Sequence, residues 1–275
     1  MDIDLSGAHL HDIDLRHCRF NDTLFSGAEF AGDAEFTAAE FTGKAWFDKA
    51  EFVGVARFLG TRFAGFTRFT GAQFAGGAVF VGAKFTGYAE FAEAEFAVGA
   101  EFNRAEFTKT AAFVEAKFIG DAAFIRARFV RGVWFEKVRF AKVVWFGETV
   151  FTGAAEFDKA TFAGAAWFGG AEFSEAAVFD KATFAENAVF DKARFAGRVE
   201  FDRTEFAGNT WFIRTEFARP GRVRLAARLH LMFAHELPEG WRAAPPDGKP
   251  GRFLEWDPVF LAAAAVMPAP EPDNA

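Results

Sequence analysis

Hydrophobic residues recur along the chain at a nearly fixed spacing. Leu5, Leu10, Leu15 and Phe20 are five residues apart, and from Phe30 the spacing alternates between six and five as far as Phe217. Two positions before each of these anchor residues stands a small or β-branched residue, most often alanine, and the residue between the two is mostly polar. This alternation has the period of two that is typical of a β-strand, so the pattern predicts many very short strands.

A helix does not fit the pattern. With 3.6 residues per turn, anchors five residues apart would point in different directions around the helix, and no single face would hold them. Many anchors are followed two places later by a glycine, at positions 43, 54, 65, 76, 87, 153 and 164. Glycine tolerates positive φ, which a chain turning a corner often requires. We therefore expect strand and corner to alternate along the chain.

Substitutions within the pattern indicate how many strands make one coil. The bulkier inward residues occur in runs of four anchors, and one such run is Val133, Val138, Val144 and Thr149. Outward residues recur after every four anchors, a stretch that contains two six-residue and two five-residue spacings. Acids stand at positions 158, 180 and 202, and a base follows each of them at 159, 181 and 203. Both observations predict a four-sided coil of about 22 residues, with an acidic column beside a basic column along one corner.

Units such as Ala28-Glu29-Phe30-Ala31-Gly32 and Ala50-Glu51-Phe52-Val53-Gly54 resemble those of the pentapeptide-repeat proteins. Their unit is a small residue, a polar residue, Leu or Phe, and two variable residues. The resemblance implies an all-β fold, a right-handed quadrilateral β-helix, here with about ten coils of about 22 residues and two slightly enlarged corners. At about 4.8 Å per layer, ten coils would form a rod roughly 48 Å long with a core of stacked phenylalanines.

The repeat pattern also suggests the domain organisation. We expect a β-helix over residues 1–218, a capping segment over 219–261 that covers the last coil, and a disordered tail over 262–275 that is rich in Ala and Pro. Within the capping segment, the alternation from Val223 to Phe233 favours a strand, although Leu225, Leu229, Met232 and Phe233 also fit one face of a helix.

Composition and charge narrow the class of protein. The chain has 41 phenylalanines and one tyrosine among 275 residues, a bias that only a repeated structural demand explains. The net charge of −7 equals the excess of eleven acids over four bases in residues 1–51, whereas residues 109–142 hold eight bases and three acids. One cysteine, no signal-peptide pattern and no long apolar run lead us to expect a cytoplasmic protein that does not cross a membrane.

The sequence carries no signature of an enzyme or of a cofactor site. It has no phosphate-binding glycine loop, no nucleophile elbow and no paired Cys or His at zinc spacing. His9, His11 and His17 are expected to be surface histidines of the first coil, and Cys18, at an inward position, is expected to be a buried and inert thiol. We therefore predict no catalytic residues, cofactor, metal or small-molecule substrate.

Outward tryptophans provide the strongest candidate for a site. Trp145, Trp167, Val189 and Trp211 occupy the same place in successive predicted coils and would form one exposed stripe. Exposed apolar surfaces of this kind mark contacts, and the occupant would be the C-terminal segment, a second copy of the chain or another protein. Phe66 and Tyr88 form a smaller outward pair, which we expect to pack together at one enlarged corner.

These observations favour a rigid, non-catalytic scaffold for protein–protein interaction, with an unknown protein partner and a possible homodimer. The alternative, implied by the family resemblance, is a mimic of duplex DNA that binds a topoisomerase, as the quinolone-resistance members of the family do. That role needs a broadly negative rod, and the candidate acidic end is limited to residues such as Glu35, Glu40 and Glu51. Binding to nucleic acid is not expected either, because the central bases alternate with acids and lie on different faces.

Overall fold

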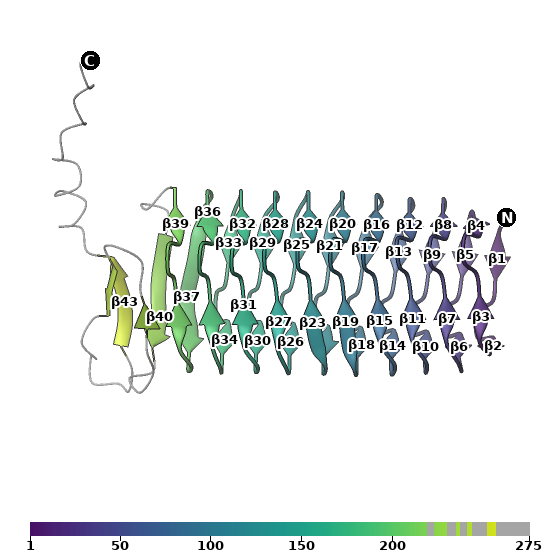
Figure 1. Ribbon diagram of the computed structural model, residues 1–275, viewed down its shortest axis with the longest axis horizontal. Helices are drawn as coiled ribbons and strands as arrows, with labels where there is room; N and C mark the ends of the chain where they lie inside the picture. The colour runs from purple at the N-terminus through teal and green to yellow at the C-terminus, as the bar shows by residue number, and fades with distance from the viewer. Residues whose placement is uncertain (219–222, 230–234, 237–240, 244–251, 257–275) are drawn as a thin grey trace, which may run out of the picture.

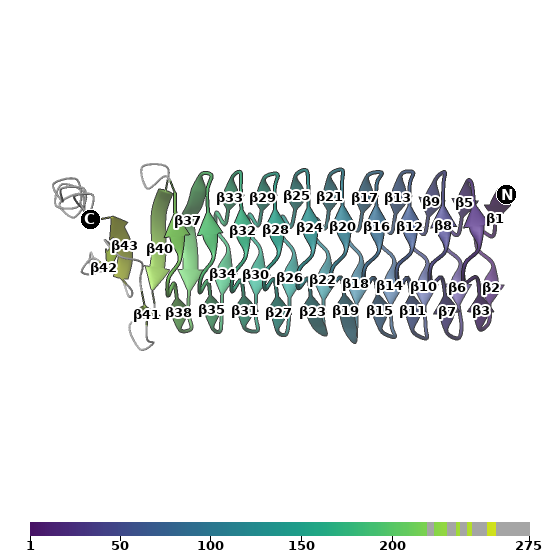
Figure 2. The same cartoon turned by 45° about the horizontal axis from the view of Figure 1, so that its top comes forward.

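The computed structural model describes residues 1–218, 223–229, 235–236, 241–243 and 252–256. Residues 1–218 form a straight rod of stacked coils, with the N-terminus at one end and the C-terminal strands at the other (Figures 1 and 2). Secondary structure in the described part consists of strands β1 to β43, and nearly all those of the coils are two residues long. No helix in the described residues has the length and apolar character needed to span a membrane.

Each coil has four faces, which we number in chain order. Face 1 contains β1 (Ile3–Asp4), β5 (Thr23–Leu24), β9 (Ala45–Trp46), β13 (Thr67–Arg68), β17 (Ala89–Glu90), β21 (Ala111–Ala112), β25 (Val133–Trp134), β29 (Ala155–Glu156) and β33 (Ala177–Val178). Face 2 contains β2 (His9–Leu10), β6 (Glu29–Phe30), β10 (Glu51–Phe52), β14 (Gln73–Phe74), β18 (Glu95–Phe96), β22 (Lys117–Phe118), β26 (Arg139–Phe140), β30 (Thr161–Phe162) and β34 (Thr183–Phe184). The longer strand β37 (Val199–Phe206) pairs with β33 and β34 and so joins faces 1 and 2.

Faces 3 and 4 each form a separate parallel sheet. Face 3 contains β3 (Ile13–Asp14), β7 (Ala34–Glu35), β11 (Ala56–Arg57), β15 (Ala78–Val79), β19 (Gly99–Glu101), β23 (Asp121–Ala123), β27 (Val144–Trp145), β31 (Ala166–Trp167), β35 (Ala188–Val189) and β38 (Thr210–Trp211). Face 4 contains β4 (Arg19–Phe20), β8 (Glu40–Phe41), β12 (Arg62–Phe63), β16 (Lys84–Phe85), β20 (Glu106–Phe107), β24 (Arg128–Phe129), β28 (Val150–Phe151), β32 (Glu172–Phe173), β36 (Arg194–Phe195) and β39 (Glu216–Phe217).

The strand register confirms the predicted period. Ala122 pairs with Val144, one predicted coil later, and the same offset holds from coil to coil through the middle of the rod. The first coil is shorter, since Ile3 pairs with Thr23 and Ile13 with Ala34. The extra residues appear where the anchor spacing changes from five to six. This confirms about ten coils of about 22 residues with two enlarged corners.

Phenylalanine rings fill the axis of the rod. Between coils the rings stack, as Phe124 does on Phe146 with centroids 4.9 Å apart and planes 11° apart. Within a coil the rings across the axis meet edge to face, as Phe113 and Phe124 do at 5.7 Å and 88°. Each ring therefore has favourable aromatic geometry in two directions. These side chains are fully buried.

One coil is widened by larger inward residues. Val133, Val138, Val144 and Thr149 lie one on each face of the same coil, as the run of four predicted. On faces 2 and 4 the ring stacks at this coil are looser, because Phe140 and Phe162, like Phe129 and Phe151, are 5.3 Å apart while Phe85 and Phe107 are 4.7 Å apart. The buried Thr149 hydroxyl donates a hydrogen bond of 2.6 Å to the carbonyl oxygen of Phe124. The added polar atom is thus satisfied by the preceding coil.

Positive φ occurs at the tight corners, after faces 1 and 3, and also at Asp12 in the short first coil. At one tight corner the Ala50 amide donates to the Phe47 carbonyl at 3.1 Å, and Lys49 between them has φ +52°. The equivalent residue is glycine in several coils, for example Gly71 with φ +64°, but fifteen non-glycine residues in the described chain have positive φ. These corners therefore hold ordinary side chains in a left-handed conformation.

The glycines that we expected to have positive φ serve another purpose. Gly43, Gly54, Gly65 and Gly76 occupy the enlarged corners, after faces 2 and 4, and their φ angles are not left-handed. A Cβ atom on Gly76 would overlap the carbonyl oxygen of Gly54 in the coil before it. Glycine is required here for a different reason from the one we expected. The stacked backbones approach so closely that a side chain does not fit, and the φ angle plays no part.

The C-terminal strands continue the stack. Strand β40 (Val223–Leu229) pairs in parallel with β37, and β41 (His235–Glu236) pairs with β38. Beyond them, β43 (Arg252–Trp256) runs antiparallel to β40 and to β42 (Trp241–Ala243). Residues 223–229 are therefore extended, as the alternation favoured, and β40 covers the edge of β37. The predicted tail over 262–275 lies outside the described residues.

We predict that the phenylalanine stack dominates stability. Replacing Phe124 with Ala should lower the free energy of unfolding by about 3 to 5 kcal/mol, because the layers above and below cannot close the cavity. Replacing its neighbour Ile125, which points outward, with Ala should change it by less than about 0.5 kcal/mol. Chemical denaturation measures both, and equal effects would contradict the assignment of inward and outward positions.

A second prediction compares two adjacent glycines. Gly76→Ala should destabilise the rod by about 1 to 3 kcal/mol, because the new Cβ meets the backbone of the preceding coil. Gly77→Ala should be neutral or stabilise by up to about 1 kcal/mol, because a Cβ there has its nearest neighbour 3.8 Å away and the φ angle is not left-handed. Thermal unfolding should shift to lower temperature for Gly76→Ala, whereas Gly77→Ala should melt at or above the temperature of the parent.

Candidate interaction surface

The predicted tryptophan stripe, Trp145, Trp167, Val189 and Trp211, forms a continuous column on face 3. Trp145 pairs in register with Trp167, Trp167 with Val189, and Val189 with Trp211. The stripe is not uniformly exposed, because Trp167 is 40% exposed, Val189 only 5%, and the other two tryptophans are half-buried. Neighbours about 4.8 Å apart along a column cover one another, and the small Val189 leaves a depression between two indoles.

The described C-terminal strands do not cover this stripe. Strand β41 extends the sheet of face 3 by one layer, with Glu236 in register with Trp211, and β42 and β43 lie beyond the end of the rod (Figures 1 and 2). These strands cap strand edges. The outer surface of face 3 stays accessible at Trp167, whose side chain is exposed. Within the described residues, the C-terminal strands are therefore not the occupant of the stripe.

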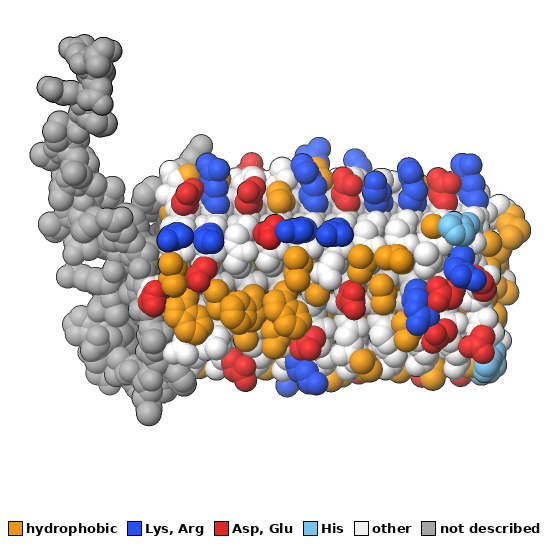
Figure 3. All heavy atoms as spheres, viewed as in Figure 1, with side chains coloured by type: hydrophobic (Ala, Val, Ile, Leu, Met, Phe, Trp, Pro, Cys, Tyr) orange, Lys and Arg blue, Asp and Glu red, His pale blue; other side chains and the backbone are white. Residues whose placement is uncertain are grey.

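The apolar surface is larger than the stripe. Apart from Met1, ten large hydrophobic side chains are exposed in the described chain, and seven of them lie on face 3 or on its two bordering corners. These seven are Val53, Leu59, Val98, Ile119, Ile125, Trp167 and Ile213. We call face 3 with these corners the hydrophobic face; over β27 and β31 its apolar side chains form a visible patch (Figure 3).

A sequence signal could have identified the corner residues. Leu59, Ile125 and Ile213 are separated from one another by whole multiples of the coil period, and so are Val53 and Ile119. The outward position just before each anchor reveals only the tryptophan stripe, whereas these residues follow the anchors at the same period.

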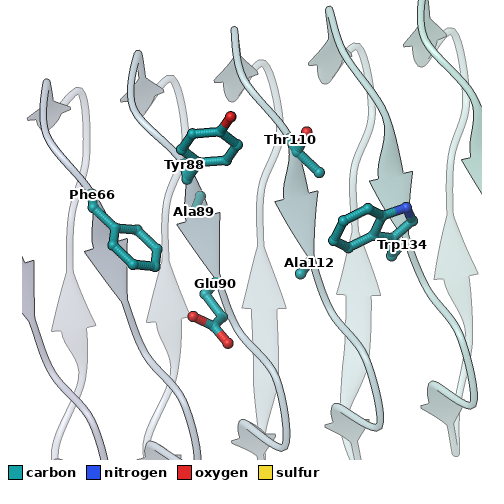
Figure 4. Close-up of a pocket in the computed structure, with 7 residues that line it drawn as sticks. All are labelled: Phe66, Tyr88, Ala89, Glu90, Thr110, Ala112 and Trp134. Carbon is teal, nitrogen blue, oxygen red and sulfur yellow. The ribbon is translucent and has the colours of Figure 1, made fainter.

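A second group of exposed aromatics lies around face 1. Phe66 and Tyr88 meet edge to face at 6.4 Å, yet they are 41% and 58% exposed, so they do not simply pack into the corner as expected. Tyr88 and Trp134 lie on either side of the coil that carries Thr110 and Ala112 (Figure 4). Tyr88 and Trp134 border a shallow groove of about 270 Å³. Trp134 lies on face 1, half a coil before Trp145 on face 3.

The candidate acidic residues are not brought together. Glu35 lies on face 3, Glu40 on face 4 and Glu51 on face 2. Glu35 pairs with Arg57 at 2.8 Å, and Glu40 approaches Arg19 at 3.5 Å. Hydrogen bonds from Arg57 and from the Val55 amide also lower the pKa of Asp33. The N-terminal acids are therefore partly neutralised and spread around the rod.

Acidic and basic columns do run side by side along the corner after face 1, as predicted. Asp180 contacts Lys181 at 3.3 Å and Arg203, one coil later, at 3.2 Å. Burial, followed by the charges of Asp180 and Glu136, raises the pKa of Asp158 above its ordinary value of 3.8. Burial also raises the pKa of Glu156. The acidic column thus retains a local excess of negative charge.

No group of three or more His, Cys, Asp or Glu side chains in the described part of the chain has an arrangement that could hold a metal ion. His9 lies 3.1 Å from Glu29, and His11 lies 2.7 Å from Asp12, so these two histidines have separate acidic neighbours. Cys18 is half-buried rather than fully buried.

Four strands per coil, parallel pairing from coil to coil and a core of stacked rings define a four-sided parallel β-helix. The family model for pentapeptide repeats, built on nine copies of the unit, matches residues 5–50, 15–62, 36–84, 47–95, 102–150, 146–193 and 168–216. The chain therefore belongs to the pentapeptide-repeat family. A comparison with curated proteins finds no match to this chain.

The raised pKa of Asp158 predicts how stability depends on pH. Above its folded-state pKa, the buried charge destabilises the protein, so Asp158→Asn should raise the melting temperature at pH 7. The advantage should shrink as the pH falls through that pKa and vanish below about 3.8, where the carboxyl is protonated in both states.

Glu148→Gln is the matched control, because Arg126 lowers the pKa of Glu148 below its ordinary value of 4.5. Its charge stabilises the fold above pH 4.5, and this contribution is lost as the pH falls through the folded-state pKa. The variant should therefore melt slightly lower at pH 7. Melting curves from pH 3 to pH 7 test both signs, and a Glu148→Gln variant more stable than the parent at pH 7 would contradict the assignment.

Proposed function

We propose that this pentapeptide-repeat protein is a rigid, non-catalytic scaffold that binds another protein through the hydrophobic face. The observation that carries the proposal is the gathering of seven of the ten exposed large hydrophobic side chains on one face and its corners. Scattered apolar residues are normal on a protein surface, whereas a contiguous apolar area usually marks a contact. We place the centre of the contact on the tryptophan stripe, since tryptophan is enriched among residues that dominate binding energy.

The rod is suited to binding rather than to enclosing a substrate. Phenylalanine rings stacked at 4.4 to 5.3 Å fill its axis and are buried. In the middle coils of the rod, exposed side chains stand on a regular backbone whose layers are hydrogen-bonded to both neighbours. Such a surface is already ordered before a partner arrives, which reduces the entropy lost on binding.

The alternative, a mimic of duplex DNA, has less support in the distribution of charge. Such a mimic needs continuous rows of carboxylates, and Glu35, Glu40 and Glu51 lie on three different faces with bases beside two of them. The acidic column after face 1 has a basic column next to it. No row of acids in the described part is long enough to resemble a phosphate backbone.

The proposal predicts the effect of removing the stripe. The double variant Trp145→Ser with Trp167→Ser should remain folded, because both side chains point away from the core, and should lose the proteins that the tagged parent recovers from its native cell, an untagged copy of the chain included. Trp134→Ser is the matched control, because this indole is 45% exposed but lies on face 1.

Mass spectrometry of the recovered proteins, with circular dichroism as the folding control, decides the outcome. If the double variant kept every recovered protein while reversal of Glu35, Glu40 and Glu51 to Lys released them, the proposal would be wrong and the contact would lie at the acidic end.

A further inference from the structure

The charges around Trp167 form a self-complementary pattern. On the corner before face 3, Lys142 lies one coil before Trp167 and Glu186 one coil after it. On the corner after face 3, the order is reversed, with Glu148 before and Lys192 after. All four side chains are exposed, and at the level of Trp167 both corners carry glycine, Gly164 and Gly170.

A two-fold rotation that exchanges the coils before and after Trp167 places opposite charges together. It brings Lys142 of one copy to Glu186 of the other and Glu148 to Lys192, so four complementary pairs surround the stripe. Among the described residues of face 3 and its corners, the rotation brings like charges together at two places: Arg126 meets Arg214, and Glu101 meets Glu236 at the outer edge of the contact. Arg126 already donates two hydrogen bonds to Glu148. The ion pairs within the described residues involve neither Lys142 nor Glu186, so both are available.

The sizes of the outward residues on face 3 fit the same rotation. Trp145 would lie opposite the recessed Val189 of the second copy, Trp211 opposite Ala123, and Trp167 against its own copy at the axis. A large residue thus meets a small one on each side of the centre. A parallel arrangement would instead stack tryptophan on tryptophan at three levels and leave gaps at Ala123 and Val189.

We propose that the tryptophan stripe binds a second copy of this chain, with the two rods antiparallel and the two-fold axis at Trp167. This inference rests on the proposed function and identifies a second copy of the chain as the partner that binds the C-terminal half of the hydrophobic face. The shared stretch of about five coils is roughly 24 Å long, so the contact is small and the dimer weak. Val53 and Leu59, at the N-terminal end of the face, lie on coils outside this stretch, and Val98 lies at its edge.

Sedimentation of the full chain over a range of concentrations tests the inference. The parent should show a concentration-dependent dimer, and Trp167→Ser should sediment as a monomer. Lys142→Glu places two acids together at two symmetric points and should weaken the dimer about tenfold. Adding Glu186→Lys to it restores the charge pairs in the antiparallel arrangement alone, so the double variant should recover the affinity of the parent.

Each result bears on the inference separately from the proposed function. A parent that stays monomeric at every concentration, or a charge-swapped double variant as weak as Lys142→Glu, would overturn the antiparallel dimer. The proposed function would survive either result if Trp145→Ser with Trp167→Ser still lost recovered proteins other than the chain itself. The charge variants leave the core unaltered, so a folding defect in Trp167→Ser would not prevent a decision.

Discussion

The distance between stacked strands sets almost everything else in this molecule. Parallel strands lie about 4.8 Å apart, and that is also a favourable separation for two offset aromatic rings. A phenylalanine at the same place in every coil can therefore stack on its neighbours without straining the backbone, as Phe85 and Phe107 do at 4.7 Å. The small residue two positions before most anchors leaves room for the ring, and where Val133, Val138, Val144 and Thr149 take this position, the stack of Phe129 on Phe151 lengthens to 5.3 Å.

Because the core is so regular, the outside of the rod can vary freely. Outward side chains rest on a two-residue strand whose backbone bonds and inward neighbour do not depend on them. The same outward position on face 3 accordingly holds Arg57, Glu101, Ala123 and Trp145. A contact surface can then arise from outward residues alone, and this separation between core and surface explains why the hydrophobic face coexists with a stable fold.

The fold could be predicted from the sequence because one constraint is repeated forty times. The enlarged corners follow from the anchor spacing, the number of sides and the period follow from the substitutions around the anchors, and the family model matches the same region. The corners could not be predicted in detail. Whether Gly76 is needed for its φ angle or for space depends on the backbone of the coil beneath it, which the sequence around Gly76 does not contain. Similarly, Trp134 has the same local pattern as Trp145, and only the half-coil between them separates their faces.

The corner residues with positive φ have a consequence for how such a rod changes length. Each coil repeats the same backbone path, so a duplication or deletion of one whole coil moves all later coils along the axis by one layer and leaves every later residue on the same face. A duplication or deletion of half a coil would instead move every later residue to the opposite face. Tight and enlarged corners would still alternate, because left-handed corners such as those at Lys49 and Gly60 follow both face 1 and face 3. Gene rearrangement can thus move a binding face to the other side of the rod while the phenylalanine core remains continuous.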